Sequence, residues 1–267
     1  MEDRVKVTIE DGVADVRLNR ADKMNALDAD MFTAIAETGA RLKHDANLRA
    51  VVLSGEGRAF CAGLDVERMA AVANGESLLP FPQLDQRTHG VANFVQHIVW
   101  LWRELPVPVI AAVHGIALGG GFQLALGADM RYVAPDTRMG IIEPKWGLVP
   151  DMAGTVLLRH LARADVVREL TYTARIISAE EAIACGFATR LEADPRAAAL
   201  NAARQIAAHS PHAIRAAKRL LNQAVASDDV QGLTAETMEQ KALLGSPNQI
   251  EAVRANMAKR MPNWSNP

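Results

Sequence analysis

The sequence has few cysteines and no long uncharged apolar run. Its 267 residues include only Cys61 and Cys185. In a reducing compartment two cysteines so far apart are expected to stay free thiols. No uncharged apolar stretch reaches the roughly 18 residues that a membrane helix needs. The first residues, Met1 to Val5, carry no basic region followed by an apolar run. We therefore expect a cytoplasmic protein without a signal peptide.

The sequence also has no segment in which charges of one sign are concentrated. The net charge is −2 at pH 7, and no five or six like charges follow one another. Nucleic acid and membrane surfaces attract strongly basic segments, so neither is an expected partner. Apolar residues make up 49% and charged residues 22% of the chain. This composition is typical of a globular protein with a substantial core.

Several catalytic signatures are absent from the sequence. It contains neither the G-x-G-x-x-G of dinucleotide-binding folds nor the G-x-x-x-x-G-K-[ST] of P-loop enzymes. The hydrolase motif G-x-S-x-G and the zinc motifs H-E-x-x-H and C-x-x-C are missing as well. We therefore expect no nucleotide site of these two kinds, no serine-hydrolase chemistry and no metal site.

Strands and helices are predicted to alternate over the first part of the chain. Residues 5–9 and 13–18 alternate in hydropathy around Asp11-Gly12, which is a strong signal for a β-hairpin. Asp28 is placed to cap a helix that follows it. This alternation is typical of an α/β fold. The other elements expected here are a helix from 94 to 105 and buried strands at 50–53, 107–113 and 129–133.

The later part of the chain is predicted to be helical. Residues 70–92 contain Asn74-Gly75 and two prolines without a clear period, which favours a mobile loop near a functional site. We expect an α/β core at residues 1–195 that carries the site, and a helical C-terminal region at 196–267 that covers the core or joins subunits. The predicted late helices span 164–173, 178–185, 195–208, 211–225, 229–243 and 247–260.

Two glycine-rich turns share one construction, in which a buried strand leads through glycines to the start of a helix. One contains Ala62-Gly63-Leu64, and the other contains Gly119-Gly120-Gly121. Each is expected to leave backbone N–H groups unpaired at a helix N-terminus. Such turns often serve only tight packing or phosphate binding. Two donors aimed at one point, however, form an oxyanion hole, worth roughly 2.7–4 kcal/mol per donor in acyl chemistry.

At these residues the sequence resembles the crotonase (enoyl-CoA hydratase/isomerase) superfamily, and the resemblance extends over nearly the whole chain. It implies a crotonase-like spiral of ββα units with C-terminal helices that take part in trimer contacts, often in a dimer of trimers. It also implies an acyl-CoA thioester substrate in fatty-acid metabolism, with coenzyme A as part of the substrate and no separate cofactor. The motifs in family order are Leu18-Asn19-Arg20 through Asn25-Ala26-Leu27, Ala59 through Asp65, Pro108 through Gly121, Gly140 through Thr155, Leu170 through Arg175, and Ser210-Pro211.

The resemblance assigns binding roles by position. It makes the backbone N–H groups of Leu64 and Gly120 the oxyanion donors. The coenzyme A contacts that the resemblance implies are Lys23, Met24, Ala26, Ala62 and, from the helical tail, Lys259. For Lys23 and Lys259, an ordinary solvated surface charge is the alternative.

Typical hydratases of this superfamily hold a water molecule between two glutamates. The first normally follows the triple glycine by two residues, where this sequence has Gln123. An amide does not exchange a proton at neutral pH, so Gln123 is expected at most to orient water. The second glutamate corresponds to Glu143, which we expect to act as acid or base with a raised pKa. A helix-capping or salt-bridged Glu143 is the structural alternative.

Asp151 directs the prediction toward isomerisation. Dienoyl-CoA isomerases of the superfamily use a glutamate four residues before a glycine and an aspartate four after it, as Glu143 and Asp151 stand around Gly147. Residues 170–175 also look closest to that branch. The sequence departs from it in having two residues between Asp151 and Gly154-Thr155, and Gln123 where an aspartate is common. Asp151 is alternatively a turn residue or the N-cap of a helix near Gly154.

The predicted mechanism is a proton shuttle. One of the two carboxylates, Glu143 or Asp151, removes a proton, the oxyanion hole holds the enolate, and the other carboxylate returns a proton further along the acyl chain. The alternatives are a hydratase in which Gln123 orients water, and a non-catalytic acyl-CoA-binding protein on an enzyme fold. Cys61 and His114 are expected to be packed structural groups rather than catalytic ones.

Overall fold

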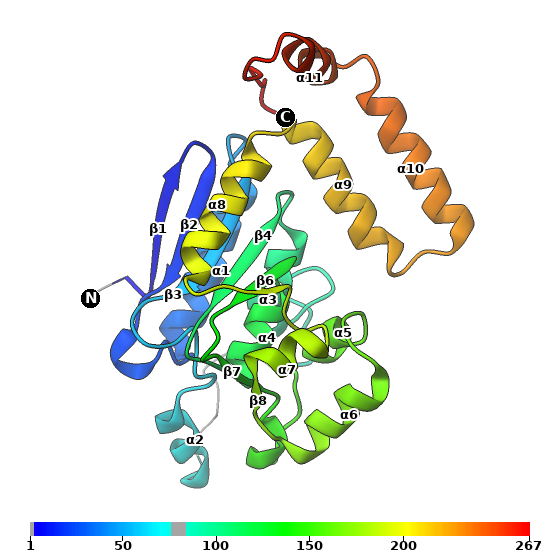
Figure 1. Ribbon diagram of the computed structural model, residues 1–267. Helices are drawn as coiled ribbons and strands as arrows, with labels where there is room; N and C mark the ends of the chain where they lie inside the picture. The colour runs from blue at the N-terminus through cyan, green and yellow to red at the C-terminus, as the bar shows by residue number, and fades with distance from the viewer. Residues whose placement is uncertain (1–2, 76–83) are drawn as a thin grey trace.

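The protein, seen here in a computed structural model that describes residues 3–75 and 84–267, is built on a six-stranded sheet (Figure 1). The strand order is β1-β2-β3-β4-β6-β9. The first pair is the predicted hairpin, β1 and β2, which turns at Asp11-Gly12. All later neighbours pair in parallel. The strands are β1 Val5–Glu10, β2 Val13–Leu18, β3 Ala50–Gly55, β4 Val109–Val113, β6 Met130–Val133 and β9 Arg190–Leu191.

A second, three-stranded sheet contains β5 (Ile116–Leu118), β7 (Arg138–Gly140) and β8 (Ile177–Ser178). A strand of the large sheet is followed by one of the small sheet and then by a helix, as in β4, β5 and α4 (Gly120–Leu126). This arrangement is the expected spiral of ββα units. The sequence did not predict these small strands or β9, because segments of two or three residues are too short to show a period.

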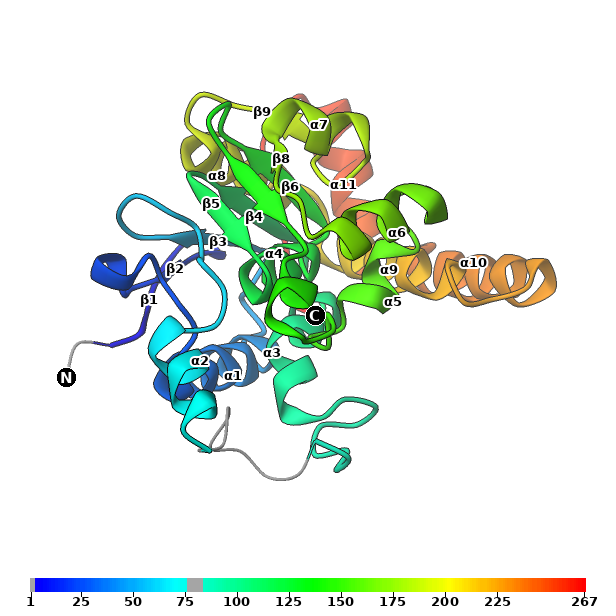
Figure 2. The same ribbon diagram turned by 90° about the horizontal axis from the view of Figure 1, so that it is seen from below.

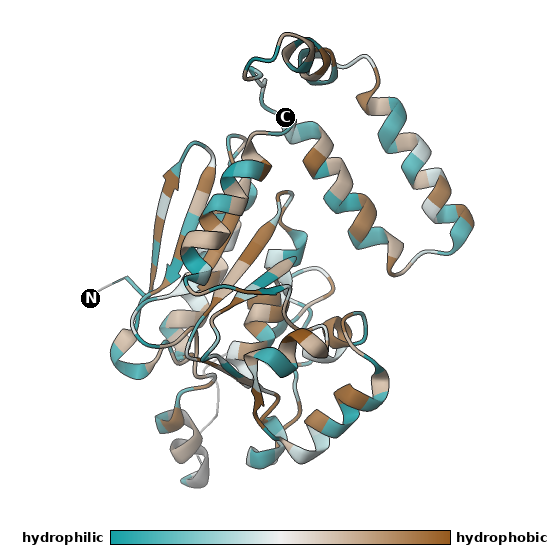
Figure 3. Cartoon of the chain, viewed as in Figure 1, coloured by the Kyte–Doolittle hydropathy of each residue, from teal (hydrophilic) through white to brown (hydrophobic). Residues whose placement is uncertain are grey.

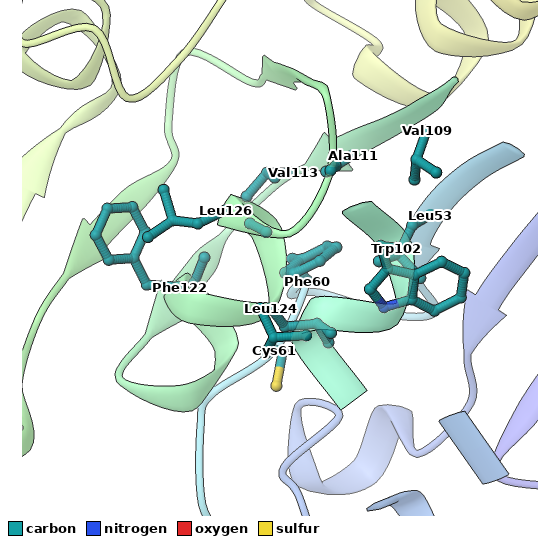
Figure 4. Close-up of a cluster of buried hydrophobic side chains, with 14 of the residues drawn as sticks. Leu53, Phe60, Cys61, Trp102, Val109, Ala111, Val113, Phe122, Leu124 and Leu126 are labelled. Carbon is teal, nitrogen blue, oxygen red and sulfur yellow. The ribbon is translucent and has the colours of Figure 1, made fainter. Parts of the chain in front are cut away.

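Both faces of β3 and β4, at the centre of the large sheet, are buried, which explains the continuous apolar runs of these two strands. Val51 and Leu53 of β3 face the main core, whereas Ala50 and Val52 face a smaller cluster. The main core lies between the sheet and α1 (Ala29–Lys43), α3 (Phe94–Glu104) and α4. Figure 4 shows its centre, where Phe60 and Trp102 lie among strand and helix residues. On the other face, Ala199 and Ala203 of α8 (Pro195–Ala207) cover the sheet.

Most helices lie where the sequence predicts them. Asp28 caps α1, as predicted, by accepting a hydrogen bond of 2.8 Å from the Met31 N–H. The prediction of a loop at 70–92 is wrong at its start, because a helix extends to Ala73, and residues 76–83 lie outside the described part. The remaining helices are η1 Ala21–Lys23, α2 Val66–Ala73, η2 Glu143–Trp146, α5 Gly154–Leu158, α6 Ala164–Thr173, α7 Ala179–Ala184, α9 Pro211–Ala224, α10 Asp229–Leu243 and α11 Pro247–Met257.

The helices α9, α10 and α11 extend away from the sheet (Figure 1). One buried side chain anchors α9 to the core: the Lys218 ammonium donates to the carbonyls of Trp102 and Val107 and pairs with Asp129 at 2.8 Å. By contrast, α10 has no buried residue. Apolar patches are visible along α9 and α10 in Figure 3. The division of the chain at residues 195 and 196 stays a prediction.

Candidate active site

The two glycine-rich turns contact each other directly through their backbones. The Cys61 N–H donates to the Ile116 carbonyl at 3.1 Å, and the Leu118 N–H donates back to Cys61 at 3.2 Å. Gly63 has φ +91°, and a Cβ there would lie 2.5 Å from the Leu118 carbonyl oxygen. A Cβ on Gly121 would lie 2.2 Å from the Cys61 carbonyl oxygen. Only glycine permits so close an approach of the two turns.

The predicted oxyanion donors lie next to each other as a result. A Cβ on Gly63 would be 3.5 Å from the Gly120 nitrogen, so the turn that carries Leu64 borders the start of α4. Within residues 3–75 and 84–267, no group accepts a hydrogen bond from the N–H of Leu64 or Gly120. Gly120 is also the first residue of α4, where the helix dipole favours negative charge. Both N–H groups are therefore available to an oxygen atom of a ligand.

A buried ion pair holds the turn after Leu64. Asp65 accepts from the Arg20 guanidinium and from the Glu67 N–H, and Arg20 also contacts Asp28 at 3.4 Å. Burial alone would raise the pKa of Asp65, but the bonds from Glu67 and Arg20 hold it below its usual range. Sequence reasoning missed this pair, although Arg20 and Asp65 both lie in motifs that it singled out. Only the fold reveals that the two residues face each other.

A cavity of about 610 Å³ opens beside these donors. Residues of α2, α3 and α4 and of the segment 142–152 line it. Figure 2 shows the ribbons of these three helices. Its walls are mostly apolar, with a few polar groups at the inner end, as is usual for small-molecule sites. The lining residues are Phe32, Ala62, Gly63, Leu64, Val66, Met69, Leu84, Val95, Leu118, Gly119, Gly120, Gln123, Ile142, Glu143, Trp146, Leu148, Val149, Asp151 and Met152.

Glu143 is buried at the inner end of this cavity, at the start of η2. Its Oε1 accepts a hydrogen bond of 2.5 Å from Gln123 Nε2. Its Oε2 is buried and has no hydrogen-bond partner in the described part of the chain. Burial raises the pKa of Glu143, and the negative charge of Asp151 adds to the increase against the opposing bond from Gln123. Neither an N-cap nor an ion pair explains this carboxyl, so Glu143 stays a candidate acid or base.

Gln123 is fully buried, and its amide is already engaged. The amide oxygen accepts from the backbone N–H groups of Met152 at 2.8 Å and Gly154 at 3.0 Å. The amide nitrogen donates to Glu143, which leaves one N–H. The side chain therefore ties three segments together: α4, the residue Glu143 and the loop from 151 to 154. This geometry favours positioning of Glu143 over the orientation of water.

Asp151 lines the same cavity. The alternative in which it caps the following helix is wrong, because α5 begins at Gly154 with Ala153 as its N-cap and no side-chain bond. Asp151 keeps contact with water, but the pocket walls reduce its hydration and raise the pKa of its carboxyl. Its negative charge also raises the pKa of Glu143.

Comparison with known proteins decides the family. A family model described as enoyl-CoA hydratase/isomerase matches residues 8–267. The chain belongs to the enoyl-CoA hydratase/isomerase family. The crystal structure of an enoyl-CoA hydratase from Bacillus anthracis superposes with a TM-score of 0.87 at 29% identity and covers 98% of both chains.

The relatives of this chain are named for different reactions. It is 31% identical to the 1,2-epoxyphenylacetyl-CoA isomerase of Escherichia coli, over 96% of each chain. It is equally 31% identical to the methylglutaconyl-CoA hydratase of Mus musculus, over 95% of this chain and 79% of that one. The carnitinyl-CoA dehydratase of Salmonella typhi is 31% identical over 99% of each chain. Family membership thus establishes acyl-CoA chemistry but not the reaction.

Four of the predicted coenzyme A contacts lie together beside the oxyanion turn of this hydratase/isomerase family member. The Ala62 N–H donates to the Met24 carbonyl at 2.9 Å, and the Leu27 N–H donates to Gly63 at 2.8 Å. These bonds place Lys23, Met24 and Ala26 along the outer side of the turn. Lys23 is an exposed surface residue and pairs there with Glu67 at 2.6 Å. Whether these residues contact coenzyme A stays a prediction.

Lys259 does not join this group within one chain. It follows α11, whose neighbouring tail residue Asn266 contacts Asn47 at 2.6 Å and also Arg49. Those residues precede the start of β3, whereas the oxyanion turn follows its other end. A six-residue strand spans roughly 20 Å, so the length of β3 lies between the residues that Asn266 contacts and the turn that carries Leu64. Figure 1 shows α11 at the opposite end of the molecule from α2, whose residues line the cavity.

Cys61 and His114 have structural partners, as expected. The Cys61 thiol is buried and donates to the Asn25 carbonyl at 3.1 Å. Burial raises the pKa of this thiol to about 12, so it stays protonated at neutral pH. The His114 ring lies 2.9 Å from the Gly57 carbonyl oxygen.

Proposed function

We propose that this protein isomerises a double bond of an enoyl-CoA or dienoyl-CoA thioester. The observation that carries the proposal is a pair of carboxyls with raised pKa values, Glu143 and Asp151, in one apolar cavity beside two unpaired N–H donors. Gln123 occupies the place of the first glutamate of typical hydratases, and its amide is engaged in holding Glu143. The site therefore offers two carboxyls that could move a proton, but it lacks the pair of glutamates that holds water in typical hydratases.

In the proposed reaction the thioester carbonyl oxygen accepts hydrogen bonds from the N–H groups of Leu64 and Gly120. One carboxylate of the pair takes a proton from a carbon conjugated with the thioester, and the released electron pair moves onto the carbonyl oxygen. The N–H groups stabilise this enolate. The other carboxyl then gives a proton to a carbon further along the chain as the electron pair returns. No atom is added, and no metal or redox cofactor takes part.

Product mass and ultraviolet absorbance test this proposal. Purified protein is incubated separately with a 2-enoyl-CoA and a 3,5-dienoyl-CoA. We expect a changed spectrum at constant mass with the dienoyl substrate. In D₂O the product should also gain deuterium, because the proton given to the acyl chain comes from a carboxyl group that exchanges with the solvent. A Glu143→Gln variant should lose both signals while it still binds the thioester.

Hydration is the competing function, and the relatives named hydratase favour it. Gln123 keeps one N–H that is not bound to Glu143, which gives a water molecule one donor in the site. A mass gain of one water on the 2-enoyl-CoA would replace the isomerase proposal. Tight binding without turnover of either thioester would favour a non-catalytic role.

We also propose that the chain assembles as a homotrimer or a dimer of trimers and acts in the cytoplasm in fatty-acid metabolism. Support for assembly comes from large apolar side chains that one chain leaves uncovered on α9 and α10. Leu221 is 72%, Val230 is 74% and Leu233 is 64% exposed. Apolar surface of this kind usually marks a contact with another chain. In such an assembly, Lys259 would reach coenzyme A only from a neighbouring subunit.

A further inference from the structure

The sulfur of Met152 lies against the residue that carries one of the two oxyanion donors. A Cβ on Gly120 would be 2.8 Å from Met152 Sδ and 3.6 Å from its methyl carbon. The thioether therefore occupies the space that Gly120 leaves by having no side chain. Met152 also lines the cavity, although only 6% of the residue is exposed. This methionine thus connects the cavity wall with the residue whose N–H is proposed to hold the thioester oxygen.

The backbone of Met152 is fixed, whereas its side chain keeps rotational freedom. The Met152 N–H donates at 2.8 Å to the buried amide oxygen of Gln123. Gln123 and Gly120 belong to the same short helix, α4, so this bond ties Met152 to the element that carries the donor. A methionine side chain is unbranched and has three rotatable bonds. Rotation about these bonds turns an atom attached to the sulfur toward Gly120 without moving the backbone.

Oxidation changes the chemistry of this contact. A thioether sulfur is a weak hydrogen-bond acceptor, so reduced Met152 leaves the Gly120 N–H to a ligand. Hydrogen peroxide converts methionine to the sulfoxide, which is polar and carries an oxygen that accepts hydrogen bonds. A lone pair of the sulfur forms the S–O bond as the O–O bond breaks, and the hydroxyl on sulfur passes its proton to the leaving oxygen, which departs as water. The sulfur loses two electrons, and the peroxide gains them.

We propose that Met152 is a redox-sensitive site, at which oxidation to the sulfoxide by a peroxide closes the acyl-CoA site. The sulfoxide oxygen accepts a hydrogen bond from the Gly120 N–H and so competes with the thioester oxygen. Its polarity also opposes the packing of an apolar acyl group against this wall. Reduction of the sulfoxide opens the site again. The inference rests on the proposed function for the placement of the thioester, but it does not require that a proton is transferred.

Binding of a saturated thioester, which cannot isomerise, tests this inference. The full-length protein is treated with hydrogen peroxide, peptide masses locate each added oxygen, and titration calorimetry measures the affinity for hexanoyl-CoA. Oxidation of Met152 should weaken binding by at least about tenfold, a difference of about 1.4 kcal/mol. Methionine sulfoxide reductases for both sulfoxide epimers should restore it. An unchanged affinity after oxidation of Met152 would overturn the inference, as would a Met152 that resists peroxide while the exposed Met257 is oxidised.

Leucine variants show which methionine is responsible. Met152→Leu keeps a similar volume without the sulfur, so peroxide should leave its hexanoyl-CoA affinity equal to that of the same variant before treatment. Met69→Leu, at the cavity wall on α2, and Met257→Leu, at an exposed position of α11, should lose affinity on treatment as the parent does. A peroxide effect that persists in Met152→Leu and disappears in Met69→Leu would assign the sensitivity to the wrong residue for this inference.

A measurement without any thioester separates this inference from the proposed function. The glycines are labelled with an NMR-active nitrogen isotope, and the amide signals are compared before and after peroxide treatment. The Gly120 signal should shift in the parent but not in Met152→Leu, and the signal of Gly12, in the turn between β1 and β2, should stay in place in both. A shift at Gly120 without any isomerisation would refute the proposed reaction and leave the inference intact. An unmoved Gly120 signal in protein oxidised at Met152 would overturn the inference even where isomerisation is observed.

Discussion

At the scale of single residues, the proposed chemistry depends most on Glu143. Its Oε2 is buried without a partner, and its Oε1 is held by Gln123. We predict that Glu143→Gln lowers turnover by about 10²–10⁴-fold, the usual contribution of a general acid or base. The affinity for a saturated acyl-CoA should change little, because the N–H donors remain. Loss of affinity in parallel with turnover would assign Glu143 a binding role.

The same substitution is predicted to stabilise the fold at neutral and alkaline pH. The pKa of Glu143 is raised in the folded protein, so the folded state binds a proton more tightly than the unfolded chain. Stability therefore falls as pH rises from the unfolded pKa through the folded one. Glu143→Gln removes this penalty, so its Tm should exceed that of the parent at pH 8 and approach it at pH 4. Equal Tm values at pH 8 would contradict a raised pKa of Glu143 in the folded protein.

Activity should follow the same raised pKa values. The shuttle needs one ionised carboxylate, and protonation of the pair removes it. Burial raises the pKa of both carboxyls, and the carboxyl that is protonated last sets the acidic limb. The acidic limb of kcat/KM should therefore lie above the ordinary aspartate pKa of 3.8. An acidic limb below that value would place the base elsewhere.

At the scale of secondary-structure elements, the close contact of the two turns depends on Gly121. A Cβ there would lie 2.2 Å from the Cys61 carbonyl oxygen. Gly121→Ala should therefore separate the turns and lower the free energy of unfolding by about 3 kcal/mol or more. Gly232→Ala in α10 is the control, since nothing lies within 4 Å of its Cβ position and alanine favours helix by about 1 kcal/mol. Chemical denaturation of both variants measures the contrast, and similar losses would contradict this account.

The anchor of α9 yields a second element-scale prediction. Lys218 donates to two buried carbonyls and to Asp129. Lys218→Met keeps much of the side-chain volume but leaves those acceptors unpaired, which should lower the free energy of unfolding by roughly 1–3 kcal/mol. Lys6→Met, at an exposed position on β1, should change it by no more than about 0.5 kcal/mol. A neutral Lys218→Met would show that α9 docks without this anchor.

Local sequence signals predict secondary-structure elements well, but they do not predict which residues far apart in sequence contact each other. The Asp11-Gly12 turn and the Asp28 cap act within a few residues, so the sequence displays them directly. The strands β5, β7 and β8 have two or three residues each and show no period of their own. The hydrogen bonds from the Met152 N–H to Gln123 and from Arg20 to Asp65 join residues far apart in sequence, and only the fold reveals them. The family motifs led to the cavity residues, whereas the engaged state of the Gln123 amide required coordinates.

At the scale of the whole molecule, the helices α9 and α10 are predicted to carry subunit contacts. Light scattering should give a mass of three or six times 28.8 kDa. Leu233→Glu places a charge among exposed apolar residues of α10 and should shift the protein toward smaller species. Gln240→Glu adds the same charge at an exposed polar position of α10 and is the control. A monomeric parent would contradict the proposed assembly.

The central claim is that Glu143 and Asp151 move a proton along a thioester held by Leu64 and Gly120. Incubation of the parent protein with a 3,5-dienoyl-CoA and, separately, a 2-enoyl-CoA tests it most directly. We predict a changed absorbance at constant mass for the dienoyl-CoA and no gain of water on the enoyl-CoA. Addition of one water to the enoyl-CoA with an unchanged dienoyl-CoA would contradict the claim and make this protein a hydratase.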